Sequence, residues 1–298
     1  MRPWTAVPAQ QGRRFVITGA NSGVGFQAAR VLGSRGAEVV LACRNLDKGE
    51  AAARQVPGHD QGRVVVRELD VSDLDSVRSF AAALQEEYDG IDVLVNNAGV
   101  LGAPFGLTPQ GVEMHFATNH LGHFALANLL LPRIRDRVVV TSSREHRRAK
   151  GIDLDDLAWE KRPYRAYTAY AQSKLADLLF MAELQRRLSA VGSSVRAVGA
   201  HPGASSTNIT SGSGNPVLTW IGFHGQRLVS MPAWRGALNT VYAATMDVPG
   251  DTYIGPHGRF EFHGWPAAAR RSKVAEDTDL ARRLWDVSEE LTGVRFPL

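Results

Sequence analysis

Short apolar runs alternate with amphipathic segments along most of the sequence. The runs FVI, AEVVLAC, RVVVREL, IDVLVN, RVVVTSS and SSVRAVGA are rich in β-branched residues, whereas segments between them, such as SDLDSVRSFAAALQEEY, have helical spacing. Strands that are apolar on both faces predict a parallel sheet with helices on both sides. Because crossovers between parallel strands are right-handed, we expect a doubly wound α/β sheet.

Length and composition are those of a soluble globular protein. The chain has 298 residues, of which 44% are hydrophobic and 21% charged, enough for a substantial core. There is no internal repeat and no linker rich in Gly, Ser or Pro, so we expect one domain over residues 1–298. Residues 203–235 mix Gly and Ser with bulky apolar side chains, which indicates either a substrate-loop insert that covers an apolar substrate or a loop that packs its own aromatics.

Charge and cysteine content exclude several classes of partner. The net charge is +4, and the basic clusters at 144–150 and 270–273 are expected to be solvated surface, so no nucleic acid is predicted. The only cysteine, Cys43, allows neither an intrachain disulfide nor a thiolate zinc site. With no signal-peptide core and no run of about 18 apolar residues, we expect no membrane partner and a cytoplasmic location.

Two polar residues mark expected helix starts. Ser72 can cap the helix that carries Val77 and Phe80, and Thr108 followed by Pro109 is typical of an N-cap with proline at the first helical position.

The loop TGANSGVG follows the first apolar run directly. In a turn that binds a dinucleotide, one glycine permits the tight turn, one lets the backbone approach the pyrophosphate and one lets the helix pack on the strand. Gly19, Gly23 and Gly25 fit these roles, and the helix N-terminus beyond them favours an anion. A glycine-rich structural turn is the alternative. The expected cofactor contacts of this loop are Gly19, Asn21, Ser22, Gly23, Val24 and Gly25.

The second strand is expected to end beside the adenosine ribose of that dinucleotide. An acidic residue there would favour NAD, but the strand ends Ala42-Cys43-Arg44. Arg44 lies about 20 residues beyond the loop and can pair bidentately with a 2′-phosphate. The sequence therefore favours NADP(H) over NAD(H), with an ordinary surface arginine as the alternative.

Tyr170 and Lys174 are four residues apart on a predicted helix, hence on one face. An ammonium beside a phenol favours the phenolate and lowers the phenol pKa, so Tyr170 could act as a general acid or base. Tyr167 is the rival, but it lies about two turns from Lys174.

Six motifs together resemble the short-chain dehydrogenase/reductase family. They are TGANSGVG, NNAG at 96–99, TNHLGH around Asn119, VVVTSS ending at Ser143, YAQSK, and HPGASST at 201–207, and their order and spacing match over almost the whole chain. The segments ACRNLDKGE, DLDDLAWE and LWDVSEELTGV resemble the retinol-dehydrogenase-like and protochlorophyllide-reductase-like branch, which usually prefers NADP. The resemblance implies a Rossmann-type doubly wound sheet of about seven parallel strands.

The resemblance also implies a role for each motif residue. Tyr170 would exchange a proton with the substrate oxygen, and Lys174 would lower its pKa and hold the nicotinamide ribose. Ser143 would bind the substrate oxygen. Asn119 would keep a water in a proton relay leading to Lys174. The further cofactor contacts that the resemblance implies are Asp70, Val71, Asn97, Ala98, Gly99, Pro202, Gly203 and Thr207.

Some of these assignments have simpler alternatives. Asp70 could cap a helix, and the glycine-containing segments at 96–99 and 201–207 also suit plain turns. His120 and His123 are three residues apart, a spacing that could hold a metal, but without cysteine or a placed acidic partner structural histidines are favoured. We expect no metal.

The expected function is hydride transfer between NADP(H) and a hydrophobic aldehyde, ketone or secondary alcohol, in a homodimer or homotetramer. The alternative is a catalytically silent NADP-binding sensor or interaction protein on the same fold.

Overall fold

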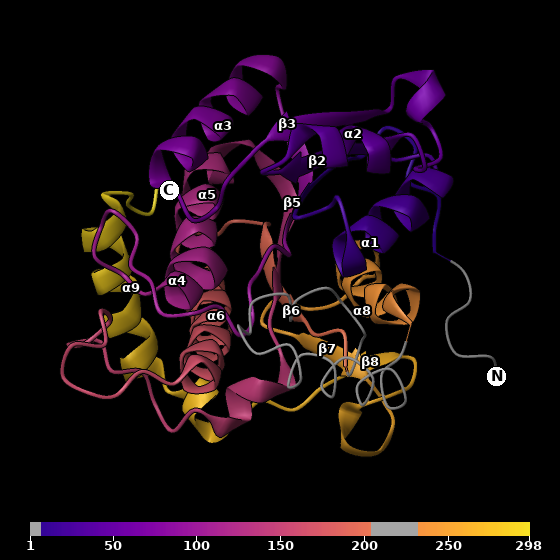
Figure 1. Ribbon diagram of the computed structural model, residues 1–298. Coiled ribbons are helices and arrows are strands. Elements are labelled where there is room, and N and C mark those ends of the chain that lie inside the picture. Colours follow the sequence, from indigo (N-terminus) through magenta and orange to yellow (C-terminus); the bar gives the residue numbers. More distant parts are fainter. Residues whose placement is uncertain (1–6, 204–231) are drawn as a thin grey trace, which may run out of the picture.

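The computed structural model describes residues 7–203 and 232–298, and in these residues eight strands form one sheet (Figure 1). Their order is β3-β2-β1-β4-β5-β6-β7-β8. All neighbouring pairs are parallel except β7 and β8. The strands are β1 (Arg14–Thr18), β2 (Glu38–Cys43), β3 (Val64–Glu68), β4 (Ile91–Asn96), β5 (Ile134–Thr141), β6 (Arg196–Ala200), β7 (Tyr253–Pro256) and β8 (Pro266–Ala268).

Helices cover both faces of the sheet, which confirms the predicted doubly wound α/β fold (Figure 1). One face carries α1 (Gly23–Ser34), α2 (Leu46–Ala53) and α8 (Ala233–Thr245). The other carries α3 (Leu74–Glu87), α4 (Met114–Phe116), α5 (Gly122–Leu130), α6 (Ala166–Ala190) and α9 (Thr278–Thr292). None of the helices described in the structure is both long enough and apolar enough to cross a membrane.

Strands β1 to β7 each contribute side chains to two separate cores. On β1, Phe15 and Ile17 pack under α1 and α8, whereas Val16 packs under the helices of the opposite face. This division follows from the two-residue period of a strand, whose successive side chains point to opposite sides. Both faces are apolar because both are covered, which explains the near-continuous apolar runs.

The structure differs from the sequence prediction at three local points. The sheet has eight strands rather than about seven, because the three-residue strand β8 adds to the edge in antiparallel orientation. Helix α3 is capped by Asp73, whose side chain accepts a hydrogen bond from Asp75 N, and not by Ser72. No helix begins at Thr108, which lies in a turn; Glu113 caps α4 instead.

The strand order creates a crevice beside β1. The chain leaves β1 in one direction to pair with β2 and returns on the other side to pair with β4. Loops that follow β1 and β4 therefore diverge toward opposite faces at the carboxyl edge of the sheet. Ligands of open parallel sheets bind at this kind of position.

The start of α5 lies directly against the loop after β3. A Cβ atom built on Gly122 would lie 1.8 Å from the carbonyl oxygen of Val71, which is backbone and cannot move aside cheaply. We expect Gly122→Ala to lower the free energy of unfolding by about 1–3 kcal/mol, because the helix must shift. Urea unfolding followed by tryptophan fluorescence measures this change.

The matched control is Gly151→Ala, since no atom lies within 4 Å of a Cβ built there. It is expected to change stability by no more than about 0.5 kcal/mol. Equal stabilities of the two variants would contradict the close approach of α5 to Val71.

Candidate active site

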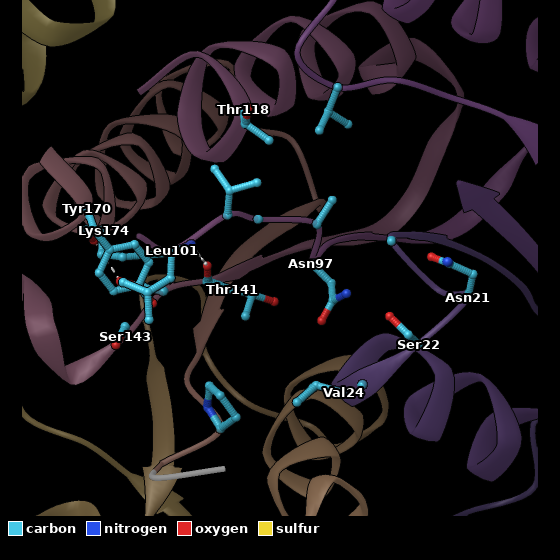
Figure 2. Close-up of a pocket in the computed structure, with 18 of the residues that line it drawn as sticks. Asn21, Ser22, Val24, Asn97, Leu101, Thr118, Thr141, Ser143, Tyr170 and Lys174 are labelled. Carbon is cyan, nitrogen blue, oxygen red and sulfur yellow. Dashed lines mark hydrogen bonds between the residues drawn. The ribbon is translucent and has the colours of Figure 1, made fainter. Parts of the chain in front are cut away.

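A cavity of about 630 Å³ follows the carboxyl ends of the central strands and receives most of the predicted site residues. Figure 2 shows Asn21, Ser22 and Val24 at one end and Ser143, Tyr170 and Lys174 at the other. Gly25 and Asn119 do not line the cavity, and Thr207 and most of the predicted substrate loop lie outside the described residues. The predicted residues that line it are Gly19, Asn21, Ser22, Gly23, Val24, Arg44, Asp70, Val71, Asn97, Ala98, Gly99, Ser143, Tyr170, Lys174, Pro202 and Gly203.

The glycine loop has no room for larger residues at two positions. Gly19 has a φ of +65°, and a Cβ there would lie 3.0 Å from the Cα of Ala98. A Cβ on Gly25 would lie 2.4 Å from Nδ2 of Asn97, so this glycine permits close packing rather than contact with a ligand. Ser22 precedes α1 and its side chain makes no capping hydrogen bond. The N-terminus of α1 therefore presents backbone N–H groups to the cavity, as an anion site requires.

The loop after β4 is fixed to β1 by a buried hydroxyl. The backbone N–H groups of Asn97 and Ala98 both donate to Thr18 Oγ1 at 2.8 Å, and Asn97 Nδ2 donates to the Thr18 carbonyl at 2.8 Å. The segment 96–99 is thus a tightly held turn that also lines the cavity.

The end of the cavity next to β2 is basic. Arg44 is 76% exposed at its side chain, and its Nη1 lies 3.6 Å from Oδ2 of Asp70. Asp70 also accepts hydrogen bonds from the N–H and the hydroxyl of Ser72, so it orders the turn before α3. The same residue lines the cavity. Lys48, in the first turn of α2, also lines the cavity and adds a second cation to its lining.

Helix α6 brings Tyr170 and Lys174 together at the other end, which confirms the predicted helix. Both residues are buried, and Lys174 Nζ lies 5.9 Å from the centre of the Tyr170 ring. Lys174 Nζ donates to the Thr141 carbonyl at 3.0 Å and to Asp177 Oδ2 at 2.9 Å. Asp177 was missed by sequence reasoning, although its position three residues after Lys174 places it on the same helical face.

Burial and charge compete over the ionisation of these groups. Burial raises the pKa of Tyr170 above its ordinary value, while the Lys174 ammonium and a hydrogen bond with Ser143 act in the opposite direction. The net pKa is therefore raised rather than lowered as the sequence suggested. Burial alone would lower the pKa of Lys174, but Asp177 outweighs it and raises that pKa. Lys174 is thus a stable ammonium at neutral pH.

The two serines and the two tyrosines have different surroundings. Ser142 donates its hydroxyl to the Lys174 carbonyl at 2.7 Å, whereas Ser143 interacts with Tyr170. Tyr167 is 48% exposed and donates to the carboxylate of Glu145. Burial and that carboxylate raise the Tyr167 pKa above its ordinary value. Of the two tyrosines, only Tyr170 is buried next to both a serine hydroxyl and an ammonium.

Asn119 does not line the cavity itself but hydrogen-bonds to Val100, which does. It lies in a π-helical turn (Ala117–Leu121), and its side chain bonds both the N–H and the carbonyl of Val100, at 2.8 and 3.1 Å. Its Nδ2 also donates to Ser173 Oγ at 2.8 Å. A Cβ on Gly99 would lie 3.1 Å from Asn119 Oδ1 and 3.7 Å from Lys174 Nζ, so the three residues are close neighbours.

The histidines considered for metal binding are engaged in hydrogen bonds. His120 Nε2 lies 2.8 Å from Ser288 Oγ, and His123 Nδ1 donates to the Asn119 carbonyl at 3.0 Å. Burial lowers the pKa of His123 to about 4 and that of His120 to about 3. In the portions of the chain that the structure covers, no group of three His, Cys, Asp or Glu side chains could hold a metal ion.

Beyond Ser143 the cavity is bordered by residues that the sequence did not indicate. They are Arg144 and Glu145, which follow Ser143, and Phe262, more than a hundred positions later. The basic segment 144–150, expected to be solvated, contributes Arg144 to the cavity and pairs Arg147 with Glu261 and Arg148 with Glu145.

Glu261 anchors the segment that carries Phe262. Its two carboxylate oxygens accept hydrogen bonds from Arg147 Nη2, at 2.8 and 2.9 Å, and one of them lies 3.3 Å from His201 Nε2. Phe260 and Glu261 both have left-handed backbone, with φ of +57° and +56°. Burial alone would raise the pKa of Glu261, but His201 and Arg147 outweigh it and lower that pKa to about 2.

The sequence matches a known protein family and known relatives over most of its length. Residues 13–216 match the family model described as short chain dehydrogenase. Human retinol dehydrogenase 13 is 38% identical over 302 residues, covering 96% of this chain and 86% of that protein.

Two solved structures are also similar. The crystal structure of an uncharacterized protein from Mycobacterium paratuberculosis is 48% identical, with a TM-score of 0.84 and 99% of each chain covered. A short chain dehydrogenase from Burkholderia cenocepacia, solved in complex with NADP, shares the fold at 21% identity, with a TM-score of 0.64 and coverage of 82% of this chain and 95% of that one.

The Glu261 anchor predicts a stability difference that depends on pH. A carboxylate whose pKa is about 2 in the folded state and about 4.5 when unfolded stabilises the fold above pH 4.5, and this contribution is lost as the pH falls toward 2. Glu261→Gln should therefore be less stable than the parent by about 1–2 kcal/mol at pH 7, and the difference should shrink below pH 4.5. Urea unfolding between pH 7 and pH 3 measures it.

Glu86→Gln serves as the control, since Glu86 is exposed and forms no ion pair with the described residues. Its stability should match the parent at every pH. A Glu261→Gln difference that stays constant across the range would contradict the anchoring of the carboxylate by Arg147 and His201.

Proposed function

This chain belongs to the short-chain dehydrogenase family of oxidoreductases, and from that premise we propose that it is an NADP(H)-dependent enzyme acting on an apolar aldehyde, ketone or secondary alcohol. The observation that carries the proposal is the convergence of Ser143, Tyr170 and Lys174 at one end of a single cavity whose other end is formed by the glycine loop and Arg44.

The residues present fit a dinucleotide with a 2′-phosphate. The pyrophosphate would lie at the uncapped N-terminus of α1, where the glycine loop lets it approach the backbone. Arg44 and Lys48 would hold the 2′-phosphate, because both line the end of the cavity beside β2. The NADP complex of the Burkholderia cenocepacia relative supports this choice of cofactor. When bound, the cofactor supplies or accepts the hydride.

The side chains at the other end divide the proton chemistry between them. Ser143 would donate a hydrogen bond to the carbonyl oxygen and stabilise the negative charge that develops on it. Tyr170 would give that oxygen its proton during reduction, or remove it during oxidation. Lys174, kept charged by Asp177, favours the phenolate that remains after proton donation. Asn119 keeps the segment at Val100 in place beside them.

The apolar character of the substrate is supported by the wall around the reaction centre. Val100, Leu101 and Phe262 line the cavity near Ser143, and the exposed ring of Tyr167 borders it. An apolar carbonyl compound would bury these side chains from water on binding. A silent NADP-binding sensor remains the second candidate function, because the same fold can serve binding alone.

Tyr170→Phe separates the two functions. Removing the hydroxyl removes the proton donor while the ring keeps its packing, so we expect the rate of NADPH oxidation with a panel of apolar aldehydes and ketones to fall by about 10²–10⁴-fold. The dissociation constant of NADPH, measured by fluorescence titration, should change by less than about threefold. Absorbance of NADPH follows the reaction.

Tyr167→Phe is the matched control, since its hydroxyl is bonded to Glu145 and not to Ser143. It should keep activity within a few-fold of the parent. Equal activity of the Tyr170→Phe variant and the parent would contradict the proton-transfer role, and NADPH binding without turnover of any compound would favour the sensor.

Arg44→Gln tests the choice between NADPH and NADH. A charge-assisted hydrogen bond to the 2′-phosphate contributes about 1.5–3 kcal/mol, so its loss should weaken NADPH binding by about 10- to 100-fold and leave NADH binding nearly unchanged. Fluorescence titration with both cofactors measures this. Arg54→Gln, an exposed arginine just beyond α2 that does not line the cavity, should alter neither constant. Equal losses for NADPH and NADH would refute a 2′-phosphate contact.

A further inference from the structure

The cavity contains a cation that the proposed reaction does not use. Arg144 follows Ser143 in the chain, begins a short 3-10 helix (Arg144–Arg148), and borders the cavity at its catalytic end. It lies far along the chain from Arg44 and Lys48, which border the end beside β2. A cation beside the reaction centre therefore needs an explanation of its own.

The carboxylates near this helix are paired with other residues. Glu145 is 2.8 Å from Arg148 Nε and accepts the hydroxyl of Tyr167. Glu261 is bound by Arg147 and lies against His201. Over residues 7–203 and 232–298, Arg144 has neither an ion pair nor a hydrogen bond, and its Nε is buried without a partner. A buried donor without an acceptor is unfavourable, so a ligand that brings an acceptor to this guanidinium would be stabilised by it.

A neighbouring aromatic ring holds the guanidinium in place. The Cζ atom of Arg144 lies 3.9 Å from the centre of the Phe262 ring. Stacking of this kind occupies the face of the guanidinium and leaves the N–H groups along its edge available for hydrogen bonds. Arg144 is therefore oriented in advance, which lowers the entropy that binding would otherwise cost.

The ring itself is presented by a strained segment. Phe260 and Glu261, directly before Phe262, have left-handed backbone that non-glycine residues rarely adopt. Arg147, His201 and the N–H of Arg270 hold the Glu261 carboxylate, at 2.8, 3.3 and 3.2 Å, and so maintain this conformation. Strain that the surrounding structure maintains in this way is typical of ligand-binding positions.

From these contacts we propose that Arg144 binds a carboxylate on the substrate. The substrate class is then a carbonyl compound, or the matching alcohol, with an apolar body against Val100, Leu101 and Phe262 and a carboxylate on Arg144. A carboxylate suits the site because its two oxygens match two N–H groups on one edge of a guanidinium. This inference rests on the proposed function for the reacting group, whereas the anion site itself depends only on Arg144 and Phe262.

The test compares acids with their uncharged amides. The compounds are the three formylbenzoates and ω-oxo alkanoates of graded length, each beside its primary amide, with NADPH as cofactor. The parent enzyme should prefer at least one acid over its amide by about 10- to 100-fold in kcat/KM, as one charge-assisted contact implies. In Arg144→Met this preference should disappear, mainly through KM for the acid, while kcat/KM for the amide changes by less than about threefold.

Two further variants separate charge from geometry. Arg144→Lys keeps the charge but not the planar guanidinium, so it should retain only part of the preference. Lys150→Met removes a cation from the same segment, but Lys150 is exposed and does not line the cavity, so it should retain the whole preference. A preference lost equally in Lys150→Met and Arg144→Met would reflect the general charge of the surface and would overturn the proposal.

A binding measurement keeps this inference separate from the proposed function. Benzoate and benzamide, which are not reduced, are titrated calorimetrically into the parent and Arg144→Met in the presence of NADP. Benzoate binding that weakens about 10- to 100-fold in the variant supports the anion site even if no compound turns over, in which case only the proposed function fails. The opposite result would be that the aldehyde groups of the acids and of the amides are reduced at equal, Tyr170-dependent rates, while benzoate binding is absent or unchanged by the substitution. That result would overturn the anion site and leave the proposed function standing.

Discussion

The hydroxyl of Thr18 is the contact on which the rest of the site depends. It accepts the N–H groups of Asn97 and Ala98 and lies 2.9 Å from His123 Nε2. Because His123 Nδ1 donates to the Asn119 carbonyl, its Nε2 carries no proton and accepts a hydrogen bond from the Thr18 hydroxyl. Burial lowers the pKa of this imidazole to about 4, so it is neutral at pH 7, and the hydrogen bond to the Asn119 carbonyl sets its tautomer. One hydroxyl thus joins the strand before the glycine loop, the turn after β4 and the π-helical turn of Asn119.

This joint connects the two ends of the cavity. Asn119 in turn bonds Val100 and Ser173, and Ser173 lies next to Lys174 in α6. Lys174 is held by the Thr141 carbonyl at the end of β5 and by Asp177. The ammonium therefore has a fixed position that does not depend on a ligand. That matters because burial raises the Tyr170 pKa, and only a nearby fixed cation and Ser143 oppose it. A phenol so placed is protonated at neutral pH and able to donate.

Local sequence patterns predicted the fold, the glycine loop and the Tyr170–Lys174 pair, and the family resemblance implied further residues that line the cavity. Alternating apolar runs predicted the doubly wound sheet, and the four-residue spacing predicted that Tyr170 and Lys174 share a helical face. Sequence reasoning failed where neighbouring residues compete for one role. Ser72 and Asp73 are both good N-caps, and the structure uses Asp73, because Ser72 is bonded to Asp70. Strand β8 was missed because three residues carry too little periodicity to be recognised.

The two ends of the cavity also differ in how much the sequence can reveal. A phosphate is bound largely by backbone N–H groups, which requires glycines at set spacing in one short segment, and such a segment is visible in the sequence. The substrate end is formed by side chains brought together from distant segments. Arg144 meets Phe262 only because β7, β8 and the Glu261 anchor return the chain to the carboxyl end of β5. In the sequence, Arg144 belongs to a basic run that resembles ordinary surface. Among residues 7–203 and 232–298 it has no acidic partner, and this emerges only from the folded structure, in which Arg147 and Arg148 pair with the nearby carboxylates. The cofactor class can therefore be predicted from a motif, whereas the substrate class depends on which charges remain unpaired after folding.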